Sequence, residues 1–118
     1  MGKGLIAWTI AMLILGSPYA FAVSSGNELL NVCQSNVSTH NGQCIGFIQG
    51  VSIGVELGEA FHGHKDLSDV CIPGNVNNAQ LKDIILIYLR QNPAKRHEPA
   101  VFAVVHSLRN AFPCGSRR

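Results

Sequence analysis

The stretch CIPGNVNNAQLKDIILIYLRQNPAKRHEPAVFAVVHSLRNAFPC, residues 71–114, decides the fold of this 118-residue chain. It contains two segments with the apolar periodicity of amphipathic helices, separated by the helix-stopping pair Asn92-Pro93. A cysteine stands at each end of the stretch, Cys71 and Cys114. A disulfide between them would close the two helices into a hairpin, and such a bond requires an oxidising compartment.

The first helix of this stretch is expected to begin after Asn77 and to end near Gln91. Asn77 is a favoured N-cap residue, and Gln80 three positions later completes a capping box. Its expected core face consists of Leu81, Ile84, Ile85 and Tyr88. Leu86 and Leu89 extend the apolar surface beyond that face. A helix that is apolar over most of its circumference is either central in the fold or partly covered by a second chain. We therefore expect a homodimer with Leu86 and Leu89 in its interface.

The second helix of the stretch follows a short loop, residues 94–97. Glu98 and Pro99 suit its first turn, because an acidic side chain favours the positive end of the helix dipole and proline lacks only an N–H that would be unpaired there. Its expected core face consists of Val101, Val104, Val105, Leu108 and Phe112. Pro113 ends this helix.

Two further helices are expected upstream. The first covers about residues 27–34 and begins with the capping-box pair Ser25 and Glu28. A polar stretch, residues 35–43, separates it from a longer helix over about residues 43–61. The chain is therefore predicted to be all-α, a small disulfide-stapled bundle of about four helices.

Glycine recurs at every fourth position of the longer upstream helix, at Gly46, Gly50, Gly54 and Gly58. Four interior glycines cost a helix about 3–4 kcal/mol relative to alanine. The polar residues Gln49, Ser52, Glu56 and Glu59 form a narrow stripe, and the glycines fall on the opposite, apolar side. We expect the glycines to form a groove that faces the rest of the protein, where another helix approaches closely. The polar residues in its centre argue against a membrane-spanning GxxxG helix.

The first 22 residues have the pattern of a secretory signal peptide. Lys3 precedes an apolar run over residues 5–15, and Ala20 and Ala22 form the small-x-small pair of a signal peptidase site. A retained membrane anchor is the alternative, but the apolar run is shorter than the roughly 20 residues of a span. We expect cleavage after Ala22, one helical domain over residues 23–118, and no membrane association after cleavage.

The four cysteines, Cys33, Cys44, Cys71 and Cys114, all follow the expected signal sequence. In an exported chain of this size they indicate two disulfides, with three possible pairings. The helical layout favours Cys33–Cys44 and Cys71–Cys114, because each pair joins the ends of two antiparallel neighbouring helices. A zinc site is not expected, since no two cysteines have CxxC spacing.

The composition favours a binding protein over an enzyme or a nucleic-acid-binding protein. Without Lys3, eight basic residues stand against seven acidic ones, a balance that provides no basic stripe for phosphates. The chain has no nucleophile elbow or nucleotide fingerprint, and disulfide-bonded cysteines cannot act as thiolates. His62 and His64 lack further metal ligands nearby, and His106 is expected on the exposed side of the last helix. No catalytic residue, metal or cofactor is predicted.

Several groups of residues carry a family resemblance. They are Cys44-Ile45-Gly46-Phe47-Ile48-Gln49-Gly50-Val51, Cys71-Ile72-Pro73, Val76, Gln80, Tyr88-Leu89, Pro93, His97, Ala100 and Ala111-Phe112-Pro113-Cys114. In these positions the chain resembles the Tai-type periplasmic immunity proteins, which protect against type VI secretion amidase effectors. The resemblance implies a small helical protein that dimerises in the periplasm and blocks a papain-like cysteine amidase, an enzyme that cuts peptidoglycan peptides.

The implied mechanism is occlusion of the amidase's active-site cleft. The matching residues specify the scaffold, so we expect the partner-binding residues in polar loops, first at Lys95, Arg96 and His97 and second at Asp66 and Asp69. The alternative is a periplasmic stress or chaperone-like helical protein, which would bind its clients through exposed apolar surface. Polar loops favour the selective inhibitor over that alternative.

Overall fold

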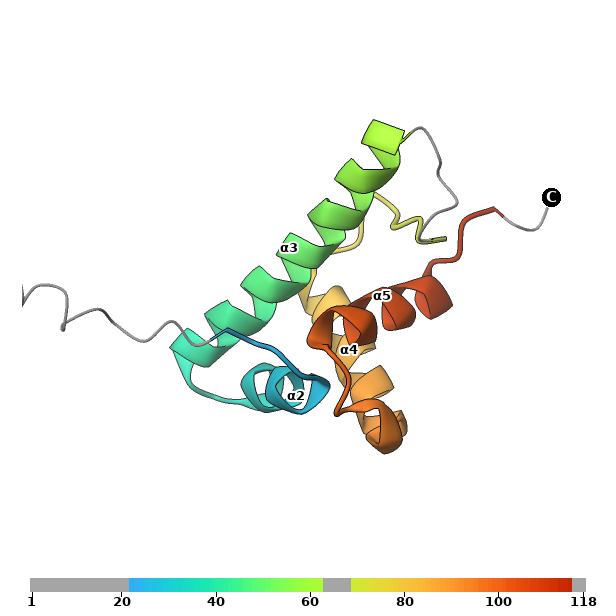
Figure 1. The fold of residues 1–118 in the computed structure, drawn as a ribbon. Helices are drawn as coiled ribbons and strands as arrows, with labels where there is room; N and C mark the ends of the chain where they lie inside the picture. The colour runs from blue at the N-terminus through green and yellow to red at the C-terminus, as the bar shows by residue number, and fades with distance from the viewer. Residues whose placement is uncertain (1–21, 63–68, 116–118) are drawn as a thin grey trace, which may run out of the picture.

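The computed structural model describes residues 22–62 and 69–115 (Figure 1), so residues 1–21 of the predicted signal sequence and Asp66 lie outside the described residues. Its helices are α2 (Gly26–Gln34), α3 (Ser38–His62), α4 (Asn78–Gln91) and α5 (Ala100–Ala111), with a short 3-10 helix, η1 (Pro93–Lys95), between the last two. These two ranges contain isolated β-bridges but no strand. The prediction of an all-α, disulfide-stapled bundle is confirmed.

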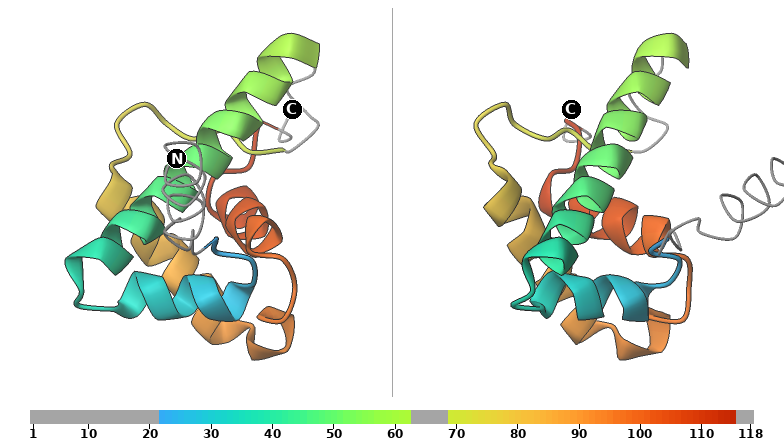
Figure 2. Two further views of the ribbon diagram at one scale, coloured as in Figure 1. Left: turned by 60° about the vertical axis from the view of Figure 1, so that its left-hand side comes forward. Right: turned by 90° about the vertical axis from the view of Figure 1, so that its left-hand side faces the viewer.

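The long helix α3 lies across the other helices, and its C-terminal part extends beyond them (Figure 1 and Figure 2). Helices α2, α4 and α5 pack against one another and against the N-terminal part of α3. The core lies where the four helices meet. Its largest fully buried apolar side chains are Leu29 from α2, Ile48 from α3, Ile85 and Leu89 from α4, and Val104 and Leu108 from α5.

Both predicted capping boxes are present. In α4 the Gln80 N–H donates to Asn77 Oδ1 at 2.9 Å, and the Asn77 N–H donates to Gln80 Oε1 at 2.9 Å. In α2 the Glu28 N–H donates to Ser25 Oγ at 3.3 Å. The Glu28 carboxylate also accepts from the Ser24 hydroxyl and the Ser24 N–H, each at 2.7 Å, and from the Ser25 N–H at 3.3 Å. These hydrogen bonds, that of the Ser24 hydroxyl first, lower the pKa of Glu28 from its usual value.

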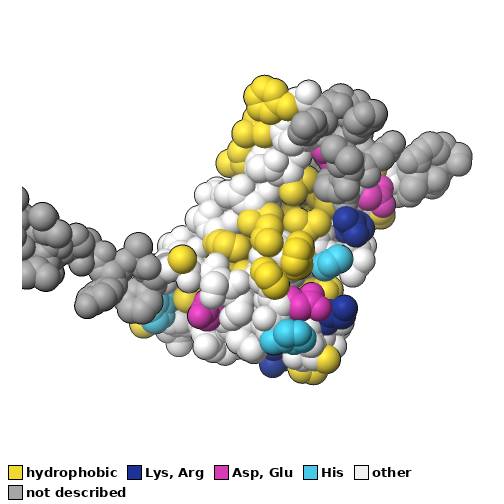
Figure 3. All heavy atoms as spheres, in the orientation of Figure 1, with side chains coloured by type: hydrophobic (Ala, Val, Ile, Leu, Met, Phe, Trp, Pro, Cys, Tyr) yellow, Lys and Arg dark blue, Asp and Glu magenta, His cyan; other side chains and the backbone are white. Residues whose placement is uncertain are grey.

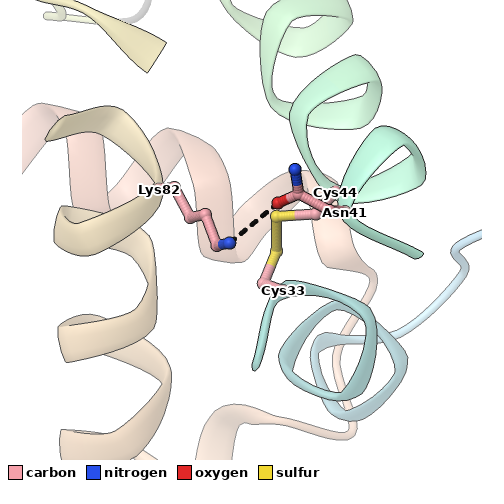
Figure 4. The surroundings of a disulfide bond; sticks show 4 residues. All are labelled: Cys33, Asn41, Cys44 and Lys82. Atoms are coloured by element: carbon pink, nitrogen blue, oxygen red, sulfur yellow. Dashed lines mark hydrogen bonds between the residues drawn. A yellow bond between two sulfur atoms is a disulfide. The ribbon is translucent and has the colours of Figure 1, made fainter. Parts of the chain in front are cut away.

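Both predicted disulfides are confirmed. Cys33–Cys44 joins the end of α2 to α3, and Cys71–Cys114 joins the segment before α4 to the segment after α5. Their sequence separations are 11 and 43 residues, for which the chain-entropy model gives about 3 and about 4 kcal/mol of stabilisation. Beside the shorter bridge, Lys82 Nζ of α4 donates to Asn41 Oδ1 of α3 at 2.8 Å (Figure 4).

Helix α3 begins at Ser38, five residues earlier than the predicted residue 43, so the connection from α2 is only residues 35–37. The Asn41 N–H already bonds to the Val37 carbonyl at 3.0 Å. The polar residues that suggested a loop are instead exposed or half-buried helical residues. The prediction was wrong because polarity marks exposure to water, and an exposed helix turn is as polar as a loop.

The predicted glycine groove of α3 does not face the protein. A Cβ added at Gly46, Gly50, Gly54 or Gly58 would meet no atom of the described residues within 4 Å. The core face of α3 instead contains Cys44, Ile48 and Ser52, and Ser52 is 7% exposed although it was placed on the polar stripe. Its hydroxyl donates to the Ile48 carbonyl at 2.8 Å, and a serine that satisfies its hydroxyl within the helix can occupy an apolar face. This burial turns the glycines toward solvent.

The premise of the predicted dimer interface on α4 is also wrong. Leu86 and Leu89 are 7% and 1% exposed and belong to the core of the single chain. Helix α4 is in contact with α2, α3 and α5 and is therefore central in the fold. A central position was the alternative explanation for a helix that is apolar over most of its circumference. Ile84 and Tyr88, which were expected in the core, are only half-buried.

The core face of α5 is shifted from the predicted one. Val101 is 40% exposed, while Ala100, Ala103 and Ser107 are buried together with Val104 and Leu108. The helix begins at Ala100, not at Glu98, because Pro99 forms an isolated β-bridge with Ser25 instead of joining the first turn. The side of α5 that faces the neighbouring helices carries small side chains, and a pattern based on hydrophobicity alone did not predict that side.

We predict that Gly26→Ala destabilises the protein by about 1–3 kcal/mol, since overpacking a filled site costs that much. A Cβ at Gly26 would lie 2.9 Å from the backbone oxygen of Arg96 and 3.0 Å from its Cα, and backbone cannot move away as a side chain end can. The matched control is Gly42→Ala in α3, where the added Cβ meets nothing and removal of a helical glycine should stabilise by up to about 1 kcal/mol. Urea unfolding of the oxidised proteins measures both changes. Equal stability of the two variants would contradict the close packing at Gly26.

We predict that Glu28→Gln flattens the acid limb of the stability curve. A lowered pKa means that Glu28 stabilises the folded state above the pKa of the unfolded carboxyl, near 4, and that this contribution is lost as the pH falls through the folded pKa. The wild type should therefore lose more unfolding free energy than Glu28→Gln between about pH 5 and pH 2. Chemical unfolding at a series of pH values measures the difference, with Glu56→Gln in the middle of α3 as control. Parallel curves for the wild type and Glu28→Gln would show that the charge of Glu28 in the α2 cap does not contribute to folding stability.

Candidate protein-binding surface

The loop over residues 92–99, between α4 and α5, is anchored to α4 by Arg96. Its Nε donates to the Leu89 carbonyl at 2.6 Å, and its guanidinium also donates to the Arg90 carbonyl at 3.3 Å. These carbonyls lie in the last turn of α4, where no further helical N–H is present to bind them. A positive charge at a helix C-terminus is also favoured by the helix dipole. Arg96 is therefore a structural anchor of the loop.

The same loop is anchored to α2 by backbone hydrogen bonds. The Asn27 N–H donates to the Arg96 carbonyl at 2.9 Å, and the Gly26 N–H donates to the Glu98 carbonyl at 3.0 Å. One residue past the loop, the Ala100 N–H donates to the Ser24 carbonyl at 2.9 Å. The first N–H groups of α2 thus bind the 92–99 loop, and the loop is fixed to a helix on each side.

Two of the predicted binding residues, Lys95 and His97, are exposed on the 92–99 loop. Lys95 Nζ lies 3.7 Å from Glu98 Oε1, and the two side chains are 59% and 33% exposed. Such a solvent-exposed ion pair adds less than about 1 kcal/mol to stability. These side chains are therefore available to a partner, whereas Arg96 is occupied within the loop.

The first turn of α5, next to the loop, exposes two large apolar side chains. Val101 is 40% exposed and Phe102 is 49% exposed. The Phe102 ring lies against the ring of His106, with centroids 6.4 Å apart. His106 is half-buried, not exposed as predicted, and sequence reasoning missed Phe102 altogether. The available signal was that Phe102 lies outside the predicted core face of α5, which places this large aromatic side chain on the exposed side of the helix.

Figure 3 shows the surface of this side of the molecule. Hydrophobic side chains gather at its centre, and histidine and charged side chains of both signs lie beside and below them. An apolar centre with a polar rim is the usual organisation of a protein–protein interface.

Asp69, the second-choice binding residue, lies at the other end of α5. Its carbonyl accepts from the Cys114 N–H at 3.4 Å, and the neighbouring Val70 forms a β-bridge with Pro113. The 12 residues of α5, about 18 Å of helix, separate it from the 92–99 loop. The fold therefore does not bring Asp69 together with Lys95 and His97. Asp66 and His64 lie outside the described residues, as does the side chain of His62.

A groove in the described part of the chain lies between the segment before α2 and the start of α3. It has a volume of about 500 Å³ and is lined by Ala22, Val23, Glu28, Val32, Thr39, His40 and Gln43. Glu28 is engaged in the α2 cap, and His40 Nδ1 is hydrogen-bonded to Ser35 Oγ at 2.8 Å. No group of three or more metal-binding side chains occurs among the described residues, and all four cysteines are in disulfides.

These features define a small, disulfide-stapled helical protein with a fixed surface loop suited to binding another protein. The family model of Rap1a immunity proteins matches residues 25–114, so the chain belongs to the Rap1a immunity protein family. This is a family of type VI secretion immunity proteins for amidase effectors, and its members are periplasmic. The resemblance seen in the sequence is thereby confirmed. No curated protein and no solved structure matches the chain.

We predict that Arg96→Ala costs about 1.5–3 kcal/mol of stability, the usual contribution of hydrogen bonds from a charged donor. The loss arises because two carbonyls of the α4 C-terminus and the 92–99 loop lose their common anchor. Lys95→Ala, which removes the adjacent positive charge from an exposed side chain, should change stability by less than about 0.5 kcal/mol. Thermal and urea unfolding measure both. If the two variants lose the same stability, Arg96 is not the anchor of the loop.

Proposed function

We propose that this protein protects the cell that makes it by binding a secreted papain-like peptidoglycan amidase in the periplasm and covering its active-site cleft. Membership of an immunity family for amidase effectors carries this proposal. Two disulfides suit an oxidising compartment, and the signal-peptide pattern of residues 1–22 supplies a route to it. The mature protein is then the single domain over residues 23–118.

The contact surface that we propose consists of the 92–99 loop and the first turn of α5. Lys95 and His97 provide exposed polar groups, and Phe102 provides an aromatic side chain of the kind that dominates binding energy at interfaces. A loop already bound to α2 and α4 loses little conformational entropy on docking, which allows a small inhibitor to bind tightly. Arg96 contributes by holding that loop in place.

An inhibitor of one enzyme fits these features better than a chaperone-like protein does. A chaperone binds many clients through adaptable apolar surface, whereas selective binding uses polar groups in fixed positions. The backbone of the 92–99 loop is fixed by hydrogen bonds to α2, and its exposed side chains are mainly polar or charged.

We propose, in addition, that the protein is a homodimer, as the family resemblance implies. Since Leu86 and Leu89 lie in the core of the single chain, a dimer must use other apolar side chains. The outer side of α3, where Ile53, Leu57 and Phe61 are exposed, is the candidate among the described residues.

The first test is co-purification of the oxidised protein with the amidase encoded beside its gene, followed by a peptidoglycan-peptide hydrolysis assay. We expect a stable complex that has lost hydrolytic activity. A complex that stays fully active would contradict occlusion of the cleft. Failure to bind that amidase would contradict the immunity function itself.

Variants of the proposed surface make the test specific. Phe102→Ala should weaken binding by more than about tenfold, because truncating an interface anchor costs about 2 kcal/mol or more. Ile87→Ala is its control, since Ile87 is 51% exposed on α4 and lies outside the proposed surface. Lys95→Glu should slow association and change its salt dependence, as expected of a charge at the rim of an interface.

Lys82→Glu is the control for Lys95→Glu, because it changes the net charge equally but lies near the start of α4, at the opposite end of that helix from the loop. Since it also removes the hydrogen bond to Asn41, circular dichroism checks that the variant is folded. Association rates at several salt concentrations distinguish the two variants. If both slow association equally, only net charge matters, and the loop is not at the interface.

A further inference from the structure

The side of α3 that faces away from the core is apolar and uncovered. Its large side chains, Ile53, Leu57 and Phe61, are 55%, 50% and 82% exposed. The glycines at positions 46, 50, 54 and 58 lie beside them, and within the described part of the chain no atom lies within 4 Å of a Cβ added there. We call this surface, made of the three large side chains and the four glycines, the outer face of α3. The rest of the described chain makes no use of its shape.

The outer face consists of a ridge and a groove that run side by side. Ile53, Leu57 and Phe61 are spaced four residues apart and form a ridge along the helix, and the glycines, also four residues apart, form a groove. Each ridge residue stands three positions after a glycine, so the two rows are neighbours with the same inclination. A ridge of this spacing fits into a groove of the same spacing on another helix, with the two axes crossing at about 50°.

We propose that the outer face of α3 binds the outer face of α3 in a second copy of this chain. A two-fold axis places the ridge of each copy in the groove of the other, so one helix surface supplies both halves of the contact. Absent Cβ atoms in the groove allow the two backbones to approach closely, as glycines do at helix–helix contacts. This proposal rests on the proposed homodimer and assigns its interface.

Charge and area agree with a second copy as the occupant. The outer face carries no charged side chain, so two identical copies meet there without like-charge repulsion. Residues 42–61 form about 30 Å of helix, and one side of a cylinder of that length is on the order of 500 Å². Because the axes cross at about 50°, the two helices touch only around the crossing, so two copies would bury less than about 1,000 Å² through α3, the size of a weak interface. We therefore expect a weak dimer that dissociates reversibly on dilution.

A membrane is the competing occupant. Helix α3, over Ser38–Phe61, is long and apolar enough to cross a bilayer by length and composition, and little of it is buried in the fold. Gln49, Glu56 and Glu59 lie within that span, where polar and charged groups are costly in lipid. A second protein copy does not bring those side chains into an apolar environment, so we favour it.

Sedimentation velocity of the oxidised protein at concentrations from about 1 to 200 μM, spanning the range expected for such an interface, tests the proposal. The wild type should pass from monomer to dimer. Leu57→Glu should weaken the dimer by at least about 100-fold, because a two-fold contact loses the side chain twice. Ile87→Glu places the same charge on the exposed side of α4 and should leave the association constant unchanged. Circular dichroism confirms that each variant is folded.

Gly50→Leu distinguishes a fitted contact from non-specific apolar adhesion. A leucine in the groove excludes the partner's ridge and should weaken the dimer, although it adds apolar surface and favours the helix. Stronger association of Gly50→Leu would overturn the proposal, as would a wild type that stays monomeric or an unchanged Leu57→Glu dimer. Flotation of a monomeric wild type with vesicles of phosphatidylethanolamine and phosphatidylglycerol, lost in Leu57→Glu, would assign the face to the membrane instead.

The amidase assay separates this proposal from the proposed function. A monomeric Leu57→Glu variant that still inhibits the amidase supports the α3 interface and leaves occlusion of the cleft intact. A wild type that inhibits the amidase but never dimerises overturns the α3 interface alone.

Discussion

The structure depends on the two disulfides, because the helices that they join bury a small core. A domain of about 100 residues covers a limited share of its apolar surface, and its net stability is only about 5–15 kcal/mol. By lowering the entropy of the unfolded chain, the two bridges together stabilise the folded state by about 7 kcal/mol. This contribution is comparable with the whole net stability. They also fix the directions of the helices, since each bridge joins segments from two helices or their ends.

The rigidity of the 92–99 loop follows from the needs of helix termini. The last carbonyls of α4 and the first N–H groups of α2 have no partners within their own helices. Arg96 satisfies the carbonyls with its side chain, and its own carbonyl, with that of Glu98, satisfies the N–H groups. One short loop therefore completes two helices. The side chains that it does not need for this, those of Lys95 and His97, are the ones left for a partner.

Helix α3 has two sides with different roles. One side is held in the core by Cys44, Ile48 and Ser52, and the Cys33–Cys44 bridge fixes it to α2. The opposite side carries glycines whose cost to the helix nothing in the described chain offsets. Contact with a second helix gives those glycines a physical purpose. Binding of an amidase through the 92–99 loop and self-association through α3 would then use different elements of one scaffold.

The sequence by itself determined the number of α-helices in the described chain, the N-terminal caps of α2 and α4, and both disulfide pairs. These features depend on neighbours in the chain, such as Asn77 with Gln80, or on which helix ends the cysteines mark. It also contained the family resemblance, because glycine, proline and cysteine specify a scaffold locally.

Only the tertiary structure decided which sides of the helices face inward. Ser52 is buried and Val101 is exposed because burial depends on what packs opposite, and a hydroxyl bonded to its own helix costs little there. The same holds for Leu86 and Leu89, whose apolar surface is covered within the single chain. Arg96 was expected on the binding surface, and its role as an anchor could not be read from the sequence. That role depends on carbonyls six and seven residues away, which come within reach only when the loop turns back on α4.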